Sequence, residues 1–305
     1  MKQDNSTNIK EFILLAFTNL QHFQFLLFVL VLIMYNTCLA GNLMIIFLVT
    51  RSSSLHKPMY FFISDFAILE VIFVSVIVPK LLDILITSEH GISFVGCFAQ
   101  LYVGNSTGIV ECYLLTVMAY DRHLAIHSPL LYTSIMSQIK ITLAILPWIA
   151  GFFLAGITTL FTACLEFCGP NELDHFFCDM APLHNLSCSD PFLSNLVTNV
   201  AAVFVILLPF IIIICIYTHI IITVSKIKSE EGMHKAFLTC TSHLTVASLF
   251  FVTCIIVYLQ PSGNQYDKYF ALVYLVFTPT LNPFIYTLRN SDVKTAFYSL
   301  FSSKF

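Results

Sequence analysis

The chain has 305 residues, of which 58% are hydrophobic and only 10% are charged. A soluble globular domain carries about 25% charged residues, so this chain has too few polar side chains to cover a surface that faces water. The net charge of −3 gives no electrostatic support for a nucleic-acid partner, and that class is excluded. We therefore expect an integral membrane protein whose solvent is lipid.

A helix that spans a bilayer needs about 20 mostly apolar residues. Seven runs meet this requirement, at about residues 23–50, 58–86, 97–126, 140–163, 195–225, 235–260 and 268–290. We predict an all-α membrane protein: a seven-transmembrane helix bundle at 23–290, preceded by a tail at 1–22. Within the bundle, the segment 164–194 is the longest link between spans and is rich in Cys, Pro, Asp and Asn. We predict that it is an ordered external loop.

Residues 291–305 form a cytoplasmic tail in this scheme. Apolar side chains recur in it at helical spacing, at Val293, Ala296, Phe297, Leu300 and Phe301. This pattern is typical of an amphipathic helix that lies on a membrane surface. At the other end of the chain, the tail lacks the basic segment and short apolar core of a secretory signal peptide. We expect the first span to act as an uncleaved anchor.

The distribution of Lys and Arg near the span ends sets the orientation in the membrane. If the N-terminus is outside, most of the 14 basic residues fall on the cytoplasmic side: Arg51, Lys57, Arg122, Lys140, Lys226, Lys228, Lys235, Arg289, Lys294 and Lys304. We therefore predict a multi-pass plasma-membrane protein with an extracellular N-terminus. Two glycosylation sequons, at Asn5 and Asn185, agree with this orientation, and we expect modification at Asn5.

Four cysteines face the oxidising side of the membrane, where disulfides persist. Cys97 begins the third span, and Cys168, Cys178 and Cys188 lie in the long loop. Four cysteines allow three pairings, and their spacing does not choose among them. The rival interpretation is a metal site formed by Cys168, His175, Cys178, His184 and Cys188. Because this spacing matches no compact zinc motif, we predict disulfides and no metal.

Two carboxylic acids lie mid-way along predicted spans, Glu70 in the second and Glu111 in the third. Charged groups inside a membrane are costly and usually functional. If the two lie close together, they cannot both ionise without compensation. Either they share a proton, or a small cation such as sodium lies between them, or each is protonated and hydrogen-bonded to a neighbouring helix. The sequence leaves these alternatives open.

Asp121 and Arg122 end the third span at the cytoplasmic face. The pair either anchors the helix at the membrane boundary or forms a lock that holds Arg122 in one state and frees it in another. Proline residues inside spans remove backbone hydrogen bonds and permit kinks, and here they occur at Pro209, Pro279 and Pro283. Kinked helices can supply the bistable elements that a switch needs.

Six motifs in the correct order resemble the odorant-receptor family of rhodopsin-like G-protein-coupled receptors, over nearly the whole chain. They are Gly41-Asn42, the run Leu55–Phe62, Met118-Ala119-Tyr120-Asp121-Arg122, the outer-loop run Phe167–Asp190, the run Lys235–Leu244, and Pro279–Tyr286 followed by Leu288-Arg289-Asn290. The resemblance implies a bridge between Cys97 and Cys178 and a second between Cys168 and Cys188. It also implies a small volatile or hydrophobic ligand and a stimulatory, olfactory-type G protein that raises cyclic AMP.

Carried over residue by residue, the resemblance implies a ligand pocket in the outer half of the bundle. Its walls would be Gly104, Asn105, Gly108, Ile109, Cys112, Met180, Val205, Phe251, Cys254 and Tyr258. Helix packing is the alternative role for the small residues among them. No basic residue is expected at the depth of the pocket, so we predict neutral ligands such as alcohols, esters, ketones or terpenoids.

Coupling to the G protein would use Asp121, Arg122, Tyr217, Asn282, Pro283 and Tyr286. Asn282 would also join Glu70 and Glu111 in an ion or proton site, and sodium is the one ion that we consider; no other cofactor is implied. The chain departs from the family pattern in several places. His123 replaces a usual Tyr, His127 a usual Cys and Phe251 a common Tyr, while Ile216 stands at a usual Ser and Glu70 at a position where Asp is commoner.

Two other classes remain as alternatives at this stage. A small transporter or channel could use Glu70 and Glu111 as an ion or proton relay, but the sequence lacks the internal repeats of common transporter folds. An intramembrane enzyme is disfavoured because the sequence contains no Gly-x-Ser-x-Gly or His-Glu-x-x-His motif and no Cys–His catalytic arrangement.

Overall fold

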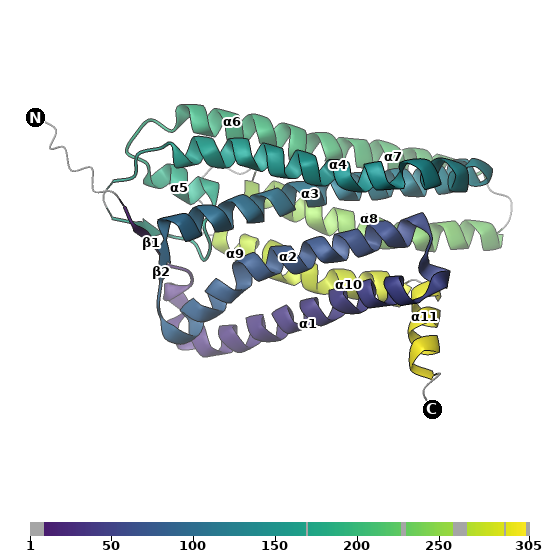
Figure 1. Ribbon diagram of the computed structural model, residues 1–305, viewed down its shortest axis with the longest axis horizontal. Coiled ribbons are helices and arrows are strands. Elements are labelled where there is room, and N and C mark those ends of the chain that lie inside the picture. The colour runs from purple at the N-terminus through teal and green to yellow at the C-terminus, as the bar shows by residue number, and fades with distance from the viewer. Residues whose placement is uncertain (1–8, 169, 227–229, 259–266, 290, 303–305) are drawn as a thin grey trace, which may run out of the picture.

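A computed structural model shows a bundle of long, roughly aligned helices with a small sheet at one end (Figure 1). The N-terminal strand lies at the end of the bundle opposite to α11, the last helix (Figure 1). The structure describes residues 9–168, 170–226, 230–258, 267–289 and 291–302.

Five uninterrupted long helices follow apolar runs of the sequence: α1 (Gln24–Arg51), α2 (Pro58–Thr87), α3 (Phe94–His127), α4 (Pro129–Ala163) and α8 (Glu230–Tyr258). Two further spans contain a π-helical turn between α-helical segments. One is α6 (Phe192–Ala202), η3 (Val203–Leu207) and α7 (Leu208–Val224); the other is α9 (Asp267–Leu272), η4 (Val273–Phe277) and α10 (Thr278–Arg289). The short helical elements are η1 (Thr18–Phe23), η2 (Ser53–Leu55), α5 (Met180–Leu186) and α11 (Ser291–Ser302).

Six helical segments of the described chain are long and apolar enough to cross a membrane: Gln24–Arg51, Pro58–Thr87, Pro129–Ala163, Phe192–Val224, Cys240–Tyr258 and Asp267–Thr287. The seventh helix of the bundle is α3, which has 34 residues but carries more polar side chains. It packs against α2, α4, α7 and α8, so its polar groups are surrounded by protein instead of lipid. The fold is a seven-helix membrane bundle.

Apolar side chains cover the outside of the bundle as well as filling most of its core. Large apolar residues such as Phe25 and Leu130 lie on the outside, 75% and 95% exposed, while Asn42, Glu70 and Asn282 are buried in the interior. This arrangement suits a protein in lipid, where polar groups have to be satisfied inside the bundle.

A three-stranded sheet that the apolar pattern does not predict covers the end of the bundle near the N-terminus. Strand β1 (Glu11–Leu14) is central, antiparallel to β2 (Gly91–Ser93) and parallel to β3 (Glu172–Leu173). Phe12 is fully buried and packs edge-on against Phe167 with ring centroids 5.6 Å apart. The sheet therefore joins the N-terminal segment, the loop before α3 and the long loop after α4.

The ends of the helices differ from the prediction mainly in α4. This helix begins at Pro129 and not near residue 140, because Pro is favourable in the first turn of a helix and starts it before the apolar run. At the other end of the bundle, α11 is attached through Asp292, which binds Lys57 Nζ at 2.7 Å and the Tyr60 hydroxyl at 3.0 Å. These two bonds connect the start of α2 to the C-terminal helix.

Helices α3 and α4 approach each other closely at Gly151. A Cβ atom on this residue would lie 2.5 Å from Val110 Cγ2 and 2.8 Å from the Ser106 carbonyl oxygen. Because a backbone oxygen cannot move aside cheaply, only glycine fits here. Gly156, further along the same helix, has room, since its Cβ would meet the ring of Tyr102 at 3.8 Å.

We predict that Gly151→Ala destabilises the protein by about 1–3 kcal/mol, the usual cost of overpacking, whereas Gly156→Ala is close to neutral. The measurement is the apparent Tm of purified full-length protein in detergent, with both variants compared with wild type. Equal melting temperatures for the two variants would contradict the close α3–α4 contact.

Candidate functional site

A cavity of about 510 Å³ lies in the half of the bundle nearest the sheet. Residues of α2, α3, α4, α5, α6, η3, α8, α9 and η4 line it, together with strand β3 and the loop before α5. Both π-helical turns contribute, through Val205 and Ile206 on one side and Tyr274 and Leu275 on the other. Small-molecule sites typically have volumes of about 300–1,000 Å³, so the cavity has a suitable size for a small ligand.

Two disulfides hold the loop over the cavity. Cys97 at the start of α3 is bonded to Cys178, and Cys168 is bonded to Cys188. Gln100 reinforces the first connection, because its Oε1 accepts a hydrogen bond from the Cys178 amide at 3.0 Å. Since these four thiols are paired, the alternative metal site in the loop loses its sulfur ligands. The pairing is the one that the family resemblance implies.

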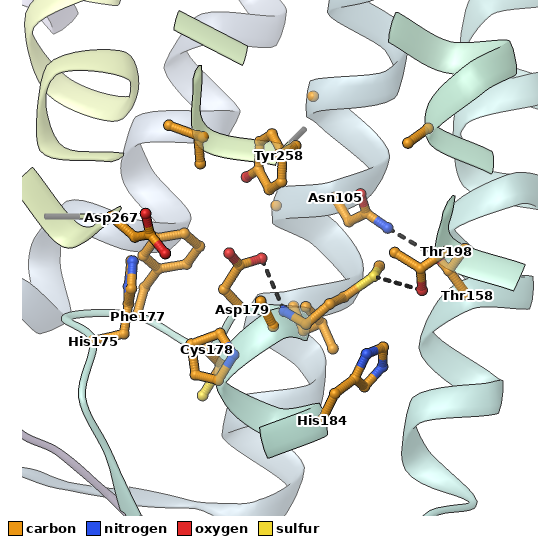
Figure 2. Close-up of a pocket in the computed structure, with 18 of the residues that line it drawn as sticks. Asn105, Thr158, His175, Phe177, Cys178, Asp179, His184, Thr198, Tyr258 and Asp267 are labelled. Carbon is orange, nitrogen blue, oxygen red and sulfur yellow. Dashed lines mark hydrogen bonds between the residues drawn. The ribbon is translucent and has the colours of Figure 1, made fainter. Parts of the chain in front are cut away.

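Of the two loop histidines, His184 has hydrogen-bond partners at both ring nitrogens, whereas His175 Nδ1 is buried without one among the described residues. His184 accepts or donates at both nitrogens, with Nδ1 2.6 Å from Asn195 Oδ1 and Nε2 2.8 Å from Ser194 Oγ. His175 is buried, and burial lowers its pKa to about 3, so its ring is neutral at physiological pH. Both side chains line the cavity and appear with Phe177 and Cys178 in Figure 2.

The α3 wall of the cavity contains Gly104, Asn105, Gly108, Ile109 and Cys112. Asn105 Nδ2 donates a hydrogen bond to Thr158 Oγ1 on α4 at 3.0 Å (Figure 2). Gly108 leaves space beside η4, because a Cβ there would lie 3.3 Å from the Tyr274 hydroxyl. The family resemblance implies that these positions share one wall, and the structure brings all five to the cavity.

Four of the remaining pocket residues of the sequence analysis also line the cavity: Met180, Val205, Cys254 and Tyr258. Met180 begins α5, and its sulfur accepts a hydrogen bond from Thr198 at 3.6 Å (Figure 2). Phe251 is the exception, because it does not line this cavity. It is fully buried and packs against Phe210 and Phe250, with centroids 5.6 and 5.2 Å away. One turn further along α8, Cys254 takes the position on the wall.

Charged residues at the mouth of the cavity were missed by the sequence analysis. Lys268 is 3% exposed and lines the cavity, although no basic residue was expected there. Its Nζ lies 2.6 Å from Asp174 Oδ1, so a carboxylate of the long loop compensates its charge. Sequence spacing could not find this pair, because the two residues come from segments far apart in the chain. Asp179 and Asp267 add negative charge at the same level (Figure 2).

The carboxylic acids of the two central spans are both buried, Glu70 on α2 and Glu111 on α3. Glu70 accepts a hydrogen bond from Asn282 Nδ2 on α10, and it also acts electrostatically on Glu111. Among the described residues, Asn282 Oδ1 and the Tyr286 hydroxyl are buried without a hydrogen-bond partner. Oxygen atoms of this kind are the ligands that a small hard cation prefers. The residue types present therefore fit such an ion.

At the opposite end of α3, Arg122 Nη2 lies 2.7 Å from Asp121 Oδ2. Tyr132 on α4 donates a hydrogen bond to the other oxygen of this carboxylate at 2.9 Å. Both members of the ion pair are buried. Breaking a buried pair by removing one member leaves an uncompensated charge, so the arrangement has the properties of a lock as well as of an anchor.

The other inner residues lie around this pair on α7 and α10. The Tyr217 hydroxyl shares a hydrogen bond of 2.7 Å with His243 Nδ1, which connects α7 to α8. Tyr286 packs edge-on against Phe66 of α2, with centroids 6.2 Å apart. Pro283 packs against α1, where a Cβ on Gly41 would come within 2.7 Å of it. Asn5 lies outside the described residues, so its glycosylation stays a prediction.

The chain thus combines a seven-helix membrane bundle, a covered outer cavity and an inner acidic–arginine pair, which together define the class of G-protein-coupled receptors. It belongs to the olfactory receptor family, because the sequence model of that family, described as "Olfactory receptor", matches residues 31–304. It is 44% identical to mouse (Mus musculus) olfactory receptor 5P68 over 296 residues, covering 96% of this chain and 94% of the relative.

Other relatives show the same similarity along their whole length. Human (Homo sapiens) olfactory receptor 10A5 is 44% identical over 297 residues, with coverage of 96% and 94%, and rat (Rattus norvegicus) olfactory receptor 1468 is 43% identical over 308 residues, with coverage of 100% and 98%. The protein is therefore a multi-pass membrane receptor and not an enzyme. Membership of the family implies an odorant ligand and a G protein as its partners.

Asp179 lines the cavity, and its burial can be tested through the dependence of the protein's stability on pH. Burial raises its pKa to about 6, and the hydrogen bond from the Met180 amide opposes this only in part. Because the folded-state pKa lies above the ordinary value, the folded protein loses stability as the pH rises toward and through 6.

We predict that Asp179→Asn, which keeps the capping oxygen but carries no charge, raises the apparent Tm at pH 7 by roughly 2 °C and that the gain shrinks as the pH falls to 5. The comparison is thermal unfolding of both proteins across this range. A gain that is independent of pH would mean that Asp179 is solvated like an ordinary surface carboxylate.

Proposed function

We propose that this receptor binds small, neutral, mostly hydrophobic odorants in the outer cavity and activates a stimulatory, olfactory-type G protein, which raises cyclic AMP. In this proposal it resides in the plasma membrane with its N-terminus outside. The observation that carries the proposal is the covered cavity of about 510 Å³ in a chain that belongs to the olfactory receptor family.

The lining of the cavity supports a mostly apolar ligand with one or two polar groups. Gly104 and Gly108 leave space along α3, and Ile109, Val205 and Leu275 present apolar surface. Asn105 and Tyr258 offer hydrogen bonds from two sides. Asn105 donates one of its two amide protons to Thr158, so its second proton and its carbonyl oxygen can form hydrogen bonds with a ligand. Such a combination fixes the orientation of a ligand while burial supplies the affinity.

The charges at the mouth support a neutral ligand over an acidic one. Lys268 is the basic side chain among the lining residues, and Asp174 already compensates it at 2.6 Å. A carboxylic acid would have to displace Asp174 and would also meet Asp179 and Asp267. Like charges held close together disfavour the ionised form of each, so an alcohol, ester or ketone enters at lower cost.

Helix α3 supports the coupling between the two ends of the bundle. It lines the cavity with residues from Gly104 to Cys112 and carries Asp121 and Arg122 at its other end. A ligand can shift the receptor only through its preference for the active state. In our proposal that state swings the inner end of α8 outward, which frees Arg122 and Tyr217 and opens a cleft for the G protein.

We predict that cells containing this receptor and an olfactory-type stimulatory G protein respond to a panel of neutral odorants with a dose-dependent rise in cyclic AMP. Arg122→Ala should abolish the response at equal surface expression. Gly108→Val, which fills space beside Tyr274, should raise the half-maximal concentration by about ten-fold or more.

Gly156→Val is the matched control for the cavity variant, because it enlarges a glycine of α4 that does not line the cavity. It should leave the half-maximal concentration unchanged. Carboxylic acids outperforming all neutral compounds would overturn the ligand class, and an undiminished response of Arg122→Ala would overturn the role of the inner pair.

We also propose that Glu70, Glu111 and Asn282 form a sodium site within the bundle. Two buried carboxylates that interact electrostatically need compensation, and Asn282 Oδ1 has no hydrogen-bond partner among the described residues. A single monovalent cation would supply positive charge and use the free oxygen. A shared proton is the alternative, and it would make stability depend on pH but not on the identity of the salt cation.

We predict that sodium chloride raises the apparent Tm of the purified receptor above the value in equimolar potassium chloride by about 2–4 °C at saturating sodium. Glu70→Gln should remove the difference. Asp65→Asn is the control, since Asp65 lies on the same helix but binds Trp148 Nε1 at 3.1 Å and not the proposed site. Equal stabilisation of wild type by the two salts would favour the shared proton.

A further inference from the structure

Three histidine side chains meet at the end of the bundle that carries the Asp121–Arg122 pair. His123 and His127 are one turn apart on α3, and His219 faces them from α7. One nitrogen from each ring can be chosen so that all three lie within 4.8 Å of one another. His123 Nε2 and His219 Nδ1 already share a hydrogen bond of 2.9 Å, and the rings of His127 and His219 have centroids 5.2 Å apart. We name these residues the histidine cluster.

The geometry is close to that of a three-coordinate protein site for a metal ion. Zinc binds imidazole nitrogens at about 2.0–2.1 Å in tetrahedral sites, so that two ligand nitrogens lie roughly 3.4 Å apart. His123 Nε2 and His219 Nδ1 are 2.9 Å apart, and a nitrogen of the exposed His127 ring lies within 4.8 Å of ligand atoms on both rings. In the hydrogen bond between His123 Nε2 and His219 Nδ1, the two nitrogens share one proton. A metal ion would replace this proton and bind the lone pair of each nitrogen.

The surroundings do not oppose a cation. Arg122 precedes His123 in the sequence, but its guanidinium is paired with Asp121 at 2.7 Å and is buried, whereas His127 and His219 are exposed. Neutral imidazole suits zinc, copper and nickel better than calcium or magnesium, which prefer oxygen ligands. The exposed rings also give an ion a path to the site.

We propose that the histidine cluster is a binding site for a divalent transition-metal ion of the zinc class, with water or an incoming group as the fourth ligand. The ion connects the inner end of α3 to α7. Because His123 follows Arg122 directly, an ion held there fixes the spacing of the two helices beside the inner pair. Binding of this ion does not depend on the proposed odorant-receptor function, so either proposal can be overturned without affecting the other.

The test is a zinc-binding isotherm of the purified full-length receptor in lipid nanodiscs, measured by competition with a fluorescent chelator. Wild type should bind one zinc ion more tightly than His127→Ala or His219→Ala, each of which should weaken this site by about ten-fold or more. X-ray absorption of the zinc-loaded wild type should show three nitrogen neighbours at about 2.0 Å.

His56→Ala is the matched control, because His56 is an exposed histidine near the same end of the bundle but is not in the cluster. It should bind zinc as wild type does. The apparent Tm without zinc should be equal for all variants, which excludes a folding defect as the cause of lost binding. Equal affinity and stoichiometry in wild type and His127→Ala would overturn the proposal.

Discussion

In a bilayer, water is absent from the hydrocarbon region, and every buried polar group has to find its partner within the protein. This constraint explains why buried polar residues gather in the interior of the bundle, where α3 carries many of them. The side chains of α3 provide the wall of the outer cavity, Glu111 at mid-depth and the Asp121–Arg122 pair at the inner end. Helices α2, α4, α7 and α8 pack against α3. The sites of the receptor are thus placed along a single axis.

The outer end of this axis is fixed and the inner end is held by fewer constraints. The Cys97–Cys178 bond ties the loop to α3, and the sheet built on β1 joins three segments over the cavity. The inner contacts are hydrogen bonds and ion pairs between side chains, such as Tyr217 with His243, and these can be exchanged without breaking covalent bonds. A ligand that fits between the π-helical turns therefore acts on a rigid outer end and can shift an equilibrium at the inner end.

The sequence predicts the helices well because length and apolar character alone decide whether a segment can cross a membrane. The positions along the α3 wall, such as Gly104 and Gly108, come instead from the family resemblance. The sequence does not predict contacts between segments distant in the chain. The sheet, the Lys268–Asp174 pair and the approach of His219 to α3 arise from tertiary packing. Family resemblance assigned Phe251 and Cys254 to the pocket, and of the two only Cys254 lines the cavity, because Phe251 is fully buried against neighbouring rings.

The central claim is that a ligand in the outer cavity moves the inner end of α8 away from α3. The most direct measurement is the distance between two spin labels, one at position 128 after α3 and one at position 233 in the first turn of α8. The labelled receptor carries serine in place of the exposed Cys164 and Cys215. An odorant that raises cyclic AMP should lengthen this distance in the wild-type cavity and leave it unchanged at the same concentration in Gly108→Val. An unchanged distance under an effective odorant would contradict the account.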